Sequence, residues 1–305
     1  MLRPLPLRPG SPIAVVAPAS APRDLDRYQA GLAQLRSHYE VRTAWTSGQE
    51  RGYLAAPDSA RTAALHEAIR DADIRAIICV RGGYGCLRLL PHLDWTLART
   101  HPTLLVGYSD VTALHLAFYA RAEWTGLSGP VVTEWGDIDA ETTEPFRALA
   151  EGETPTLGSN ALSPLCSGTA TGPLLGGNLS VLTRLVGTPY APDWEGALLV
   201  LEDVAEAPYR IDRMFAHLQH AGVLDAVSGV ILGTFRPGEP PTDRPTLSLD
   251  TVISDYFEDR PYPVATGLPY GHLLPRCSLP IGVPAALNVE EDTSHLQVLQ
   301  SIVAE

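Results

Sequence analysis

A serine stands where a buried strand is expected to turn into a helix. The apolar run 104–106 ends at Gly107, Ser109 follows two residues later, and a helical pattern begins near residue 111. A serine on such a turn projects its hydroxyl over the edge of the sheet, as in a nucleophile elbow, although the usual Gly-x-Ser-x-Gly pattern is absent. On this segment alone, a helix N-cap formed by Ser109 or Asp110 is the stronger interpretation.

An acid and a histidine far along the chain would complete a serine hydrolase. Glu202 and Asp203 end the apolar run 197–201, and carboxylates on a buried strand require a partner. His272 follows an irregular Gly- and Pro-containing segment, and loops often present catalytic side chains. Taken singly, each is more simply a solvated strand end or an exposed loop residue. Taken with Ser109, they supply the nucleophile, the base and the orienting acid of acyl transfer.

A glycine-rich segment follows the third expected strand. Arg81-Gly82-Gly83-Tyr84-Gly85 contains consecutive glycines, whose backbone can approach a ligand closely and whose N–H groups can form a nest for negative charge. Such a nest suits either an oxyanion hole or a phosphate site. A phosphate loop of the Gly-Gly-Asp-Gly type would indicate a nucleotide-binding kinase, but Tyr84 stands in place of its aspartate.

Short apolar runs alternate with helical patterns over the first 140 residues. Strands are predicted at 12–17, 41–45, 74–80 and 103–110, and helices at 24–38, 58–71, 86–90 and 111–121. This alternation predicts an α/β fold with a mostly parallel sheet and right-handed crossovers. Ligands of such sheets bind beyond the carboxyl ends of the strands, so the glycine-rich segment and the Ser109 turn are expected to share one crevice.

The pattern changes after about residue 140. Residues 152–173 are rich in Gly, Ser, Thr and Pro, so we place a linker at 151–170, between a first domain at 1–150 and a second at 171–305. In the second domain, helices are predicted near 177–186 and 209–221, and strands at 196–203, 227–235, 281–289 and 295–299. These elements predict a mixed α/β or small β-rich domain.

The charge balance excludes several classes of partner. The 305 residues carry 22 basic and 35 acidic side chains, a formal charge of −13. A surface this negative repels nucleic-acid backbones and anionic membranes. The four cysteines form no Cys-x-x-Cys pair, so no metal site is expected. We find no apolar run of bilayer length and no signal-peptide core, and we therefore expect a cytoplasmic protein.

A set of segments, taken together, resembles the LD-carboxypeptidase family of serine peptidases. The segments occur in order and at compatible spacing along almost the whole chain. They are VAPAS (16–20), RGGYG (81–85), LLVGYSD (104–110), LLGGNLSVL (174–182), LEDV (201–204), YRIDRM (209–214), GLPYGH (267–272) and LPIG (279–282). This joint match favours Ser109 as a nucleophile over its interpretation as a helix cap.

The resemblance implies a Rossmann-like, glutamine-amidotransferase-like N-terminal domain, a smaller β-rich C-terminal domain, and a site between them. It implies that Ser109 attacks a carbonyl, that His272 accepts the serine proton, and that Glu202 holds His272. The backbone N–H groups of Gly83 and Asp110 would form the oxyanion hole. The resemblance implies neither a metal nor an organic cofactor, and relatives commonly form homodimers.

The substrate that the resemblance implies is a small peptide, murein tetrapeptide. Family members of this length typically remove its terminal D-alanine by cleaving an L,D-peptide bond during peptidoglycan recycling. Arg81, Tyr84 and Asn178 are our candidate substrate contacts. The sequence departs from its relatives at Ser128, where they often have histidine before Gly-Pro, and this departure bears on substrate detail.

Two further functions stay open beside the kinase. A second branch of the family hydrolyses peptidyl- or aminoacyl-adenylates and confers microcin C self-immunity; its members tend to be longer than this chain. An aromatic side chain that stacks on adenine would favour that branch, and Trp135 is the candidate. The other alternative is a non-catalytic binding protein that keeps the crevice without turning over a substrate.

Overall fold

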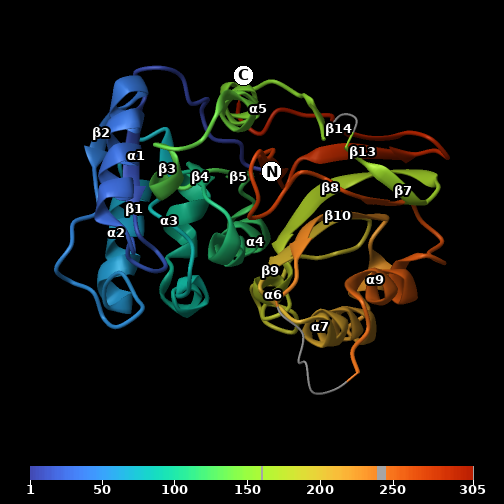
Figure 1. Ribbon diagram of the computed structural model, residues 1–305. Helices are drawn as coiled ribbons and strands as arrows, with labels where there is room; N and C mark the ends of the chain where they lie inside the picture. Colours follow the sequence, from blue (N-terminus) through green and yellow to red (C-terminus); the bar gives the residue numbers. More distant parts are fainter. Residues whose placement is uncertain (159–160, 239–244, 305) are drawn as a thin grey trace. The chain divides into compact units, whose positions relative to one another are not determined.

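The computed structural model describes residues 1–158, 161–238 and 245–304, and it divides the chain into two compact units (Figure 1). Unit 1 comprises Met1–Glu153, Ser278–Gly282 and the residues from Ser301 onward, and unit 2 comprises Thr154–Cys277 and Val283–Gln300. Two short C-terminal segments therefore belong to the first unit. The predicted division into 1–150 and 171–305 places both of these segments in the second domain instead.

Unit 1 is built on a six-stranded sheet. Its strands are β1 (Pro12–Val16), β2 (Glu40–Thr43), β3 (Ala76–Cys79), β4 (Leu104–Val106), β5 (Gly126–Ser128) and β12 (Leu279–Ile281). Their order is β12-β5-β4-β3-β1-β2, and all neighbours are parallel except β12, which pairs antiparallel with β5. This is the predicted Rossmann-like parallel sheet, closed at one edge by a strand from the end of the chain.

Helices cover both faces of this sheet. They are α1 (Leu25–His38), α2 (Asp58–Arg70), α3 (Trp95–Thr100), α4 (Thr112–Ala122) and α5 (Ala140–Glu151), with 3₁₀ turns η1 (Cys86–Arg88), η2 (Leu90–His92), η3 (Ser109–Val111) and η4 (Val132–Glu134). Right-handed crossovers place α1 on one face and α2, α3 and α4 on the other, and α3 contacts both α2 and α4. The helix predicted at 86–90 is instead the pair η1 and η2, because Pro91 cannot donate to a continuing helix.

The strand order of unit 1 reverses at β1. From β1 the chain proceeds to β2 on one side, and then crosses to β3 on the other side. Such a reversal leaves a crevice at the carboxyl ends of the two central strands, where α/β proteins bind ligands. The segments that leave β1 and β3 at this edge begin at residues 17 and 80, and the second contains the glycine-rich run.

Unit 2 contains an eight-stranded mixed sheet. Its strands are β6 (Thr156–Leu157), β7 (Ser163–Cys166), β8 (Gly168–Asn178), β9 (Leu198–Val204), β10 (Gly229–Arg236), β11 (Val264–Thr266), β13 (Pro284–Val289) and β14 (Ser294–Val298). Its helices are α6 (Leu179–Leu182), α7 (Pro208–His220), α8 (Val223–Ala226) and α9 (Leu249–Phe257). The sheet order is β6-β14-β13-β8-β9-β10-β11-β7, with a parallel centre of β8 to β11.

The predicted linker at 151–170 is wrong as a description of this segment. It contains β6, β7 and the start of β8. Small and polar residues compose these strands, and those of early β8 alternate between half-buried and exposed positions while pairing with β13. Pro164 lies in β7, an edge strand, where a missing N–H is tolerated. The composition resembles that of a loop because these strands bury few large side chains.

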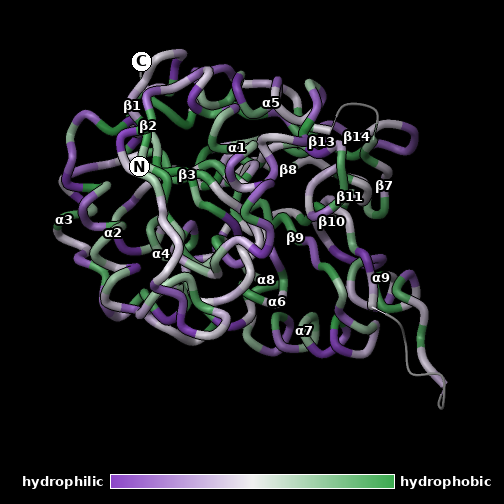
Figure 2. Tube along the Cα trace, turned by 60° about the vertical axis from the view of Figure 1, so that its left-hand side comes forward, coloured by the Kyte–Doolittle hydropathy of each residue, from purple (hydrophilic) through white to green (hydrophobic). Residues whose placement is uncertain are grey.

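The central strands form the core of each unit. Every residue of β3 and β4 is buried, as are the first six residues of β9. Figure 2 shows the hydrophobic colour concentrated on such strands, with hydrophilic colour on the outer helices and loops. In the part of the chain that the structure describes, no helix has both the length and the apolar character needed to cross a bilayer.

Candidate active site

Ser109 occupies a strained turn in unit 1. It follows β4 by three residues and has a φ of +63°, a left-handed conformation that is uncommon for any residue but glycine. The N-cap position of α4 is Val111, and Ser109 lies within η3, so Ser109 does not cap α4. Backbone strain of this kind costs about 1–3 kcal/mol and persists where the surrounding structure enforces it, often at functional sites.

A buried histidine fixes the backbone just before this turn. His115, on α4, lies 2.8 Å through Nε2 from the carbonyl oxygen of Gly107 and is 3% exposed. Because a carbonyl only accepts, Nε2 carries the proton and donates it. Burial lowers the pKa of His115 to about 4, so the ring is neutral near pH 7. Nothing in the sequence pattern links His115 to the serine.

The glycine-rich segment lies directly against the serine. A methyl group on Gly82 would stand 2.9 Å from Ser109 Cβ and 3.2 Å from its Oγ, so only glycine fits there without displacing the serine. Gly82 O accepts a hydrogen bond from Ser20 N, and the Ser20 hydroxyl accepts one from Tyr84 N at 3.2 Å. The ends of β1, β3 and β4 thus converge, as expected for the crevice within this sheet.

The carboxylate of Asp110 fastens the same two segments together. Its Oδ2 accepts a 2.8 Å hydrogen bond from Cys86 N, in a position where Asp110 is 3% exposed. Burial raises the pKa of Asp110, and the Cys86 N–H opposes that shift by favouring the charged form. The backbone N–H of Asp110 is the predicted contributor to the oxyanion hole. The Asp110 side chain also holds the start of η1 beside the Ser109 turn.

Arg61 is a buried cation that sequence reasoning missed. It lies on α2, is 2% exposed, and donates from Nη1 to the carbonyl oxygens of Pro18 and Gly85, the latter at 3.0 Å. Its Nη2 pairs with Asp58 at 2.5 Å. Arg61 therefore ties the segments after β1 and β3 to α2. Only the tertiary structure reveals this role, because an arginine on an amphipathic helix ordinarily faces solvent.

The remaining predicted residues of unit 1 lie around this loop. Gly83 has a φ of +104°, and a side chain there would collide with the Ser20 hydroxyl at 2.6 Å. Arg81 is half-buried and donates from Nη1 to Ala21 O at 3.2 Å. Tyr84 is 46% exposed and packs edge-to-face on Tyr53, with ring centroids 5.2 Å apart.

In unit 2, Glu202 and His272 lie in hydrogen-bond contact. Glu202 Oε2 is 2.9 Å from His272 Nδ1, and Glu202 Oε1 accepts from Asn178 Nδ2 at 3.1 Å. Asn178 ends β8 directly opposite Glu202 on β9, which is the reason that the amide reaches the acid. Glu202 is fully buried, whereas the His272 side chain is 21% exposed. A histidine whose Nδ1–H donates to a buried carboxylate presents Nε2 as a base.

The loop that carries His272 is held to the end of β10. Thr234 N donates to Tyr270 O at 2.8 Å, and Leu268 N donates to Leu232 O at 3.2 Å. Gly271 has a φ of +139°, and a Cβ on it would stand 3.0 Å from Glu202 Oε2. Glycine is thus required immediately before the histidine, both for its backbone conformation and for the approach of the acid.

A second buried acid, Asp203, faces away from this pair. Its Oδ2 accepts from Ser180 N at 2.8 Å and its Oδ1 accepts from Val204 N at 2.7 Å. Burial raises the pKa of Asp203 to about 6, these backbone N–H groups oppose the rise, and the neighbouring Glu202 adds to it. Asp203 therefore anchors the first turn of α6 rather than the histidine.

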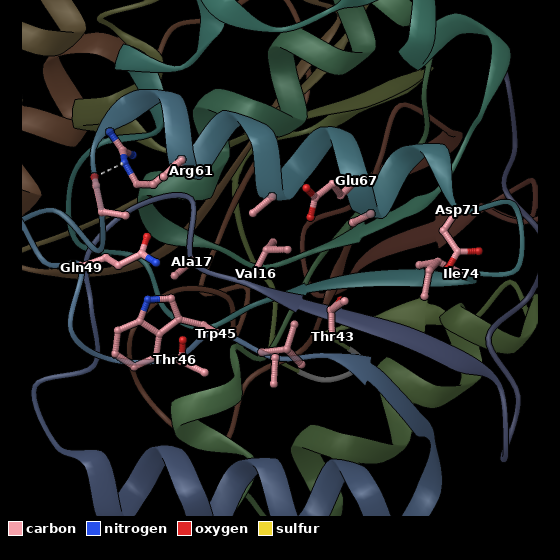
Figure 3. A pocket seen from close by; sticks show the side chains of 16 residues that line it. Val16, Ala17, Thr43, Trp45, Thr46, Gln49, Arg61, Glu67, Asp71 and Ile74 are labelled. Atoms are coloured by element: carbon pink, nitrogen blue, oxygen red, sulfur yellow. Dashed lines mark hydrogen bonds between the residues drawn. The ribbon is translucent and has the colours of Figure 1, made fainter.

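A separate hollow of about 430 Å³ lies in unit 1 between α2 and the strands β1 and β2. Figure 3 shows Trp45, Gln49 and Glu67 among the side chains around it. No predicted site residue belongs to this lining among the residues that the structure describes. Within residues 1–158, 161–238 and 245–304, no group of three or more His, Cys, Asp or Glu side chains could hold a metal ion.

Two family models match the chain. The LD-carboxypeptidase N-terminal domain matches residues 13–129, and the LD-carboxypeptidase C-terminal domain matches residues 171–287. The chain belongs to the LD-carboxypeptidase family. It is accordingly a peptidase, a class of hydrolase. The first match contains the Ser109 turn and the glycine-rich segment, and the second contains Glu202 and His272.

Relatives within the LD-carboxypeptidase family match over nearly the full chain. The "Probable murein peptide carboxypeptidase" of Bacillus subtilis is 36% identical over 97% of this chain and 94% of its own length. The "Murein tetrapeptide carboxypeptidase" of Pseudomonas aeruginosa is 33% identical over 90% of this chain and 92% of its own.

Solved structures share the fold of this LD-carboxypeptidase. The muramoyltetrapeptide carboxypeptidase from Oxalobacter formigenes superposes with a TM-score of 0.84 at 30% identity, covering 94% of this chain and 98% of that one. The wild type apo form of the microcin C7 self immunity protein MccF superposes with a TM-score of 0.89 at 23% identity over the whole of both chains. The second likeness shows the fold alone.

Proposed function

We propose that this chain is a serine-type LD-carboxypeptidase that releases the terminal D-alanine of murein tetrapeptide by cleaving the L,D-peptide bond, as part of peptidoglycan recycling. The observation that carries this proposal is the contact of the buried Glu202 carboxylate with Nδ1 of His272. A serine in a left-handed turn beside a glycine-rich loop supplies the matching nucleophile. The names of two relatives of at least 33% identity supply the substrate class.

In the proposed reaction, the Ser109 hydroxyl attacks the scissile carbonyl and His272 Nε2 accepts its proton. The C–N bond of the tetrahedral intermediate then breaks, and protonated His272 donates that proton to the departing amine of D-alanine. Water attacks the resulting ester by the same route, which frees the tripeptide and restores the serine. Glu202 stabilises the imidazolium and fixes its tautomer throughout.

We assign the oxyanion hole to the backbone N–H groups of Gly83 and Asp110. The Asp110 carboxylate, which accepts from Cys86 N, fastens together the two segments that contain these groups, and Ser20 holds the glycine-rich segment to the end of β1. Such fixed donors stabilise the negative charge that develops on the carbonyl oxygen, and the loss of one donor typically costs about 10²- to 10³-fold in rate.

The deciding experiment supplies murein tetrapeptide and, separately, an aminoacyl sulfamoyl-adenosine to the same preparation. Free D-alanine, detected by mass spectrometry, is expected from the first, and no product is expected from the second. Turnover of the adenylate without release of D-alanine would favour hydrolysis of adenylates. Tetrapeptide binding without any turnover would identify a binding protein.

Trp135, the candidate for stacking on adenine, is 6% exposed and packs edge-to-face on Phe146. Its ring therefore offers no open face to adenine.

Family membership also leads us to propose a homodimer in the cytoplasm. Light scattering of the purified protein would give twice the chain mass of 32.8 kDa for a dimer. Fractionation of cells, followed by immunodetection of the chain, tests the location.

A further inference from the structure

A basic groove lies on unit 2, on the elements that follow the two strands carrying Asn178 and Glu202. Its volume is about 510 Å³. Charged and aromatic side chains of α7 and of the segment after α6 dominate its lining, and they are Arg184, Glu206, Tyr209, Arg210, Arg213 and His217. Three arginines converge here on a chain whose formal charge is −13, so the local charge is opposite to that of the molecule.

The arginines of this groove differ in how they are neutralised. Arg210 Nη1 lies 3.3 Å from Glu206 Oε2, so that cation has an acidic partner. Arg213 stacks over Tyr209, its guanidinium carbon 5.6 Å from the ring centroid. In the described part of the chain, neither Arg213 nor Arg184 forms an ion pair with an acid. A guanidinium group can hold a carboxylate through two parallel N–H···O bonds, and both of these arginines line the groove.

The groove is built on the same segments that hold the acid–base pair. Asn178, which contacts Glu202, also accepts from Val181 N and so caps α6, and Arg184 follows two residues after that helix. Glu206 stands four residues after Glu202, so the extended chain can separate their Cα atoms by at most about 14 Å. A tetrapeptide spans about the same length. A substrate bound at His272 is therefore long enough to place an upstream group in the groove.

We propose that this groove binds the free α-carboxylate of the D-glutamate residue of the stem peptide, with Arg184 and Arg213 as its ligands. The inference rests on the proposed function and names how that site recognises its substrate. The carboxylate of the terminal D-alanine does not fit the assignment. It belongs to the residue directly after the scissile bond, whose Cα atom lies only about 3.8 Å from that of the residue before the bond. This carboxylate is therefore held close to His272. The D-glutamate carboxylate lies on the far side of the diamino acid, so more of the peptide separates it from the scissile bond.

The experiment combines one variant with one change in the peptide. D-alanine release is measured from murein tetrapeptide and from the same peptide with its D-glutamate α-carboxylate amidated, using the unchanged protein and Arg213→Gln. Amidation should raise KM of the unchanged protein about tenfold, with kcat within a factor of three. Arg213→Gln should raise KM for the free carboxylate by the same factor. Amidation should then have no further effect on the variant.

Arg184→Gln provides an independent repeat, and Arg36→Gln is the matched control, since Arg36 is an exposed arginine on α1 of unit 1. Circular dichroism melting verifies that each variant folds. If amidation still raises KM of both variants tenfold, or raises it for neither the variants nor the unchanged protein, the groove assignment is overturned while the proposed function stands. If the unchanged protein releases no D-alanine from either peptide, both the proposed function and this inference are wrong.

Discussion

The two strand ends that carry the proposed catalytic residues are fixed by different kinds of interaction. At the end of β4 in unit 1, Ser109 is placed by its backbone, with a φ of +63° and with Gly82 too close to tolerate a methyl group. At the end of β9 in unit 2, Glu202 is placed by its side chain, which bonds to Asn178 and His272. The position of Ser109 therefore depends on the space around the turn, and the position of Glu202 depends on the hydrogen-bonding atoms of its neighbours.

This difference follows from what each group must do. A nucleophile must project one small hydroxyl into open space, and a tight turn in a rigid backbone achieves that projection. A base must keep one tautomer while it gains and loses a proton, and a buried carboxylate fixes that tautomer. Substitutions at the two ends are therefore expected to fail in different ways.

The largest effects are expected from removing the reacting groups themselves. Ser109→Ala and His272→Ala should each lower kcat for D-alanine release roughly 10⁴-fold or more, because the covalent route is then closed. Steady-state assays on murein tetrapeptide measure this loss, and melting curves of both variants control for folding. Activity of Ser109→Ala equal to that of the unchanged protein would rule out the serine as nucleophile.

Glu202→Gln should cost somewhat less, roughly 10²- to 10⁴-fold in kcat. The amide retains the shape and one acceptor but loses the charge that stabilises the imidazolium, and it can select the wrong tautomer of His272. The same assay on the variant tests this expectation. A loss below about threefold would show that the contact with His272 serves only the structure.

Gly82→Ala tests whether shape governs the serine turn. The added methyl would stand 2.9 Å from Ser109 Cβ and should displace the serine, with a loss of about 10²-fold in kcat. Gly136→Ala is a matched control, because its methyl would stand 2.9 Å from Ala30 Cβ, a comparable overlap elsewhere in unit 1. Equal kcat for the two variants would contradict the claim that Gly82 positions the serine.

The two ends should also respond oppositely to pH. Burial lowers the pKa of His115 to about 4 from an ordinary 6.5, so between these values the unfolded chain binds a proton that the folded chain does not. Stability should therefore fall as pH drops from 6.5 to 4, by roughly 3 kcal/mol from this group. Denaturant titrations of the unchanged protein and His115→Gln should show their difference in unfolding free energy shrinking over this interval. A constant difference would contradict the assignment.

Asp203 should have the reverse sign. Burial raises its pKa to about 6 from an ordinary 3.8, so between these values the folded chain holds a proton that the unfolded chain has released. Stability from this group should fall as pH rises from 4 to 6, by roughly 2–3 kcal/mol. Asp203→Asn removes this titration, so the unfolding free energy of the variant should rise relative to that of the unchanged protein as pH increases from 4 to 6. If the variant instead became more stable relative to the unchanged protein as pH falls, Asp203 would be charged in the folded chain.

Sequence patterns predicted the parts of the fold that depend on local signals. The apolar runs of β1, β3 and β4 and the glycine-rich segment are visible because buried parallel strands are continuously hydrophobic. The strands within 151–170 were missed, because their small residues become a sheet only by pairing with β11, β13 and β14. Arg61, His115 and Asp203 were missed as supporting residues for the same reason. Each of them also bonds to a backbone group of another segment, which only the tertiary fold brings to it.

The central claim is that Ser109 and His272, which belong to separate units, act in one catalytic step. The most direct test compares D-alanine release by Ser109→Ala, by His272→Ala and by the variant that carries both changes. Residues that act as one group are strongly non-additive, so the double variant should be no slower than the slower single variant, within about threefold. A double variant whose loss equals the product of the two single losses would contradict the claim.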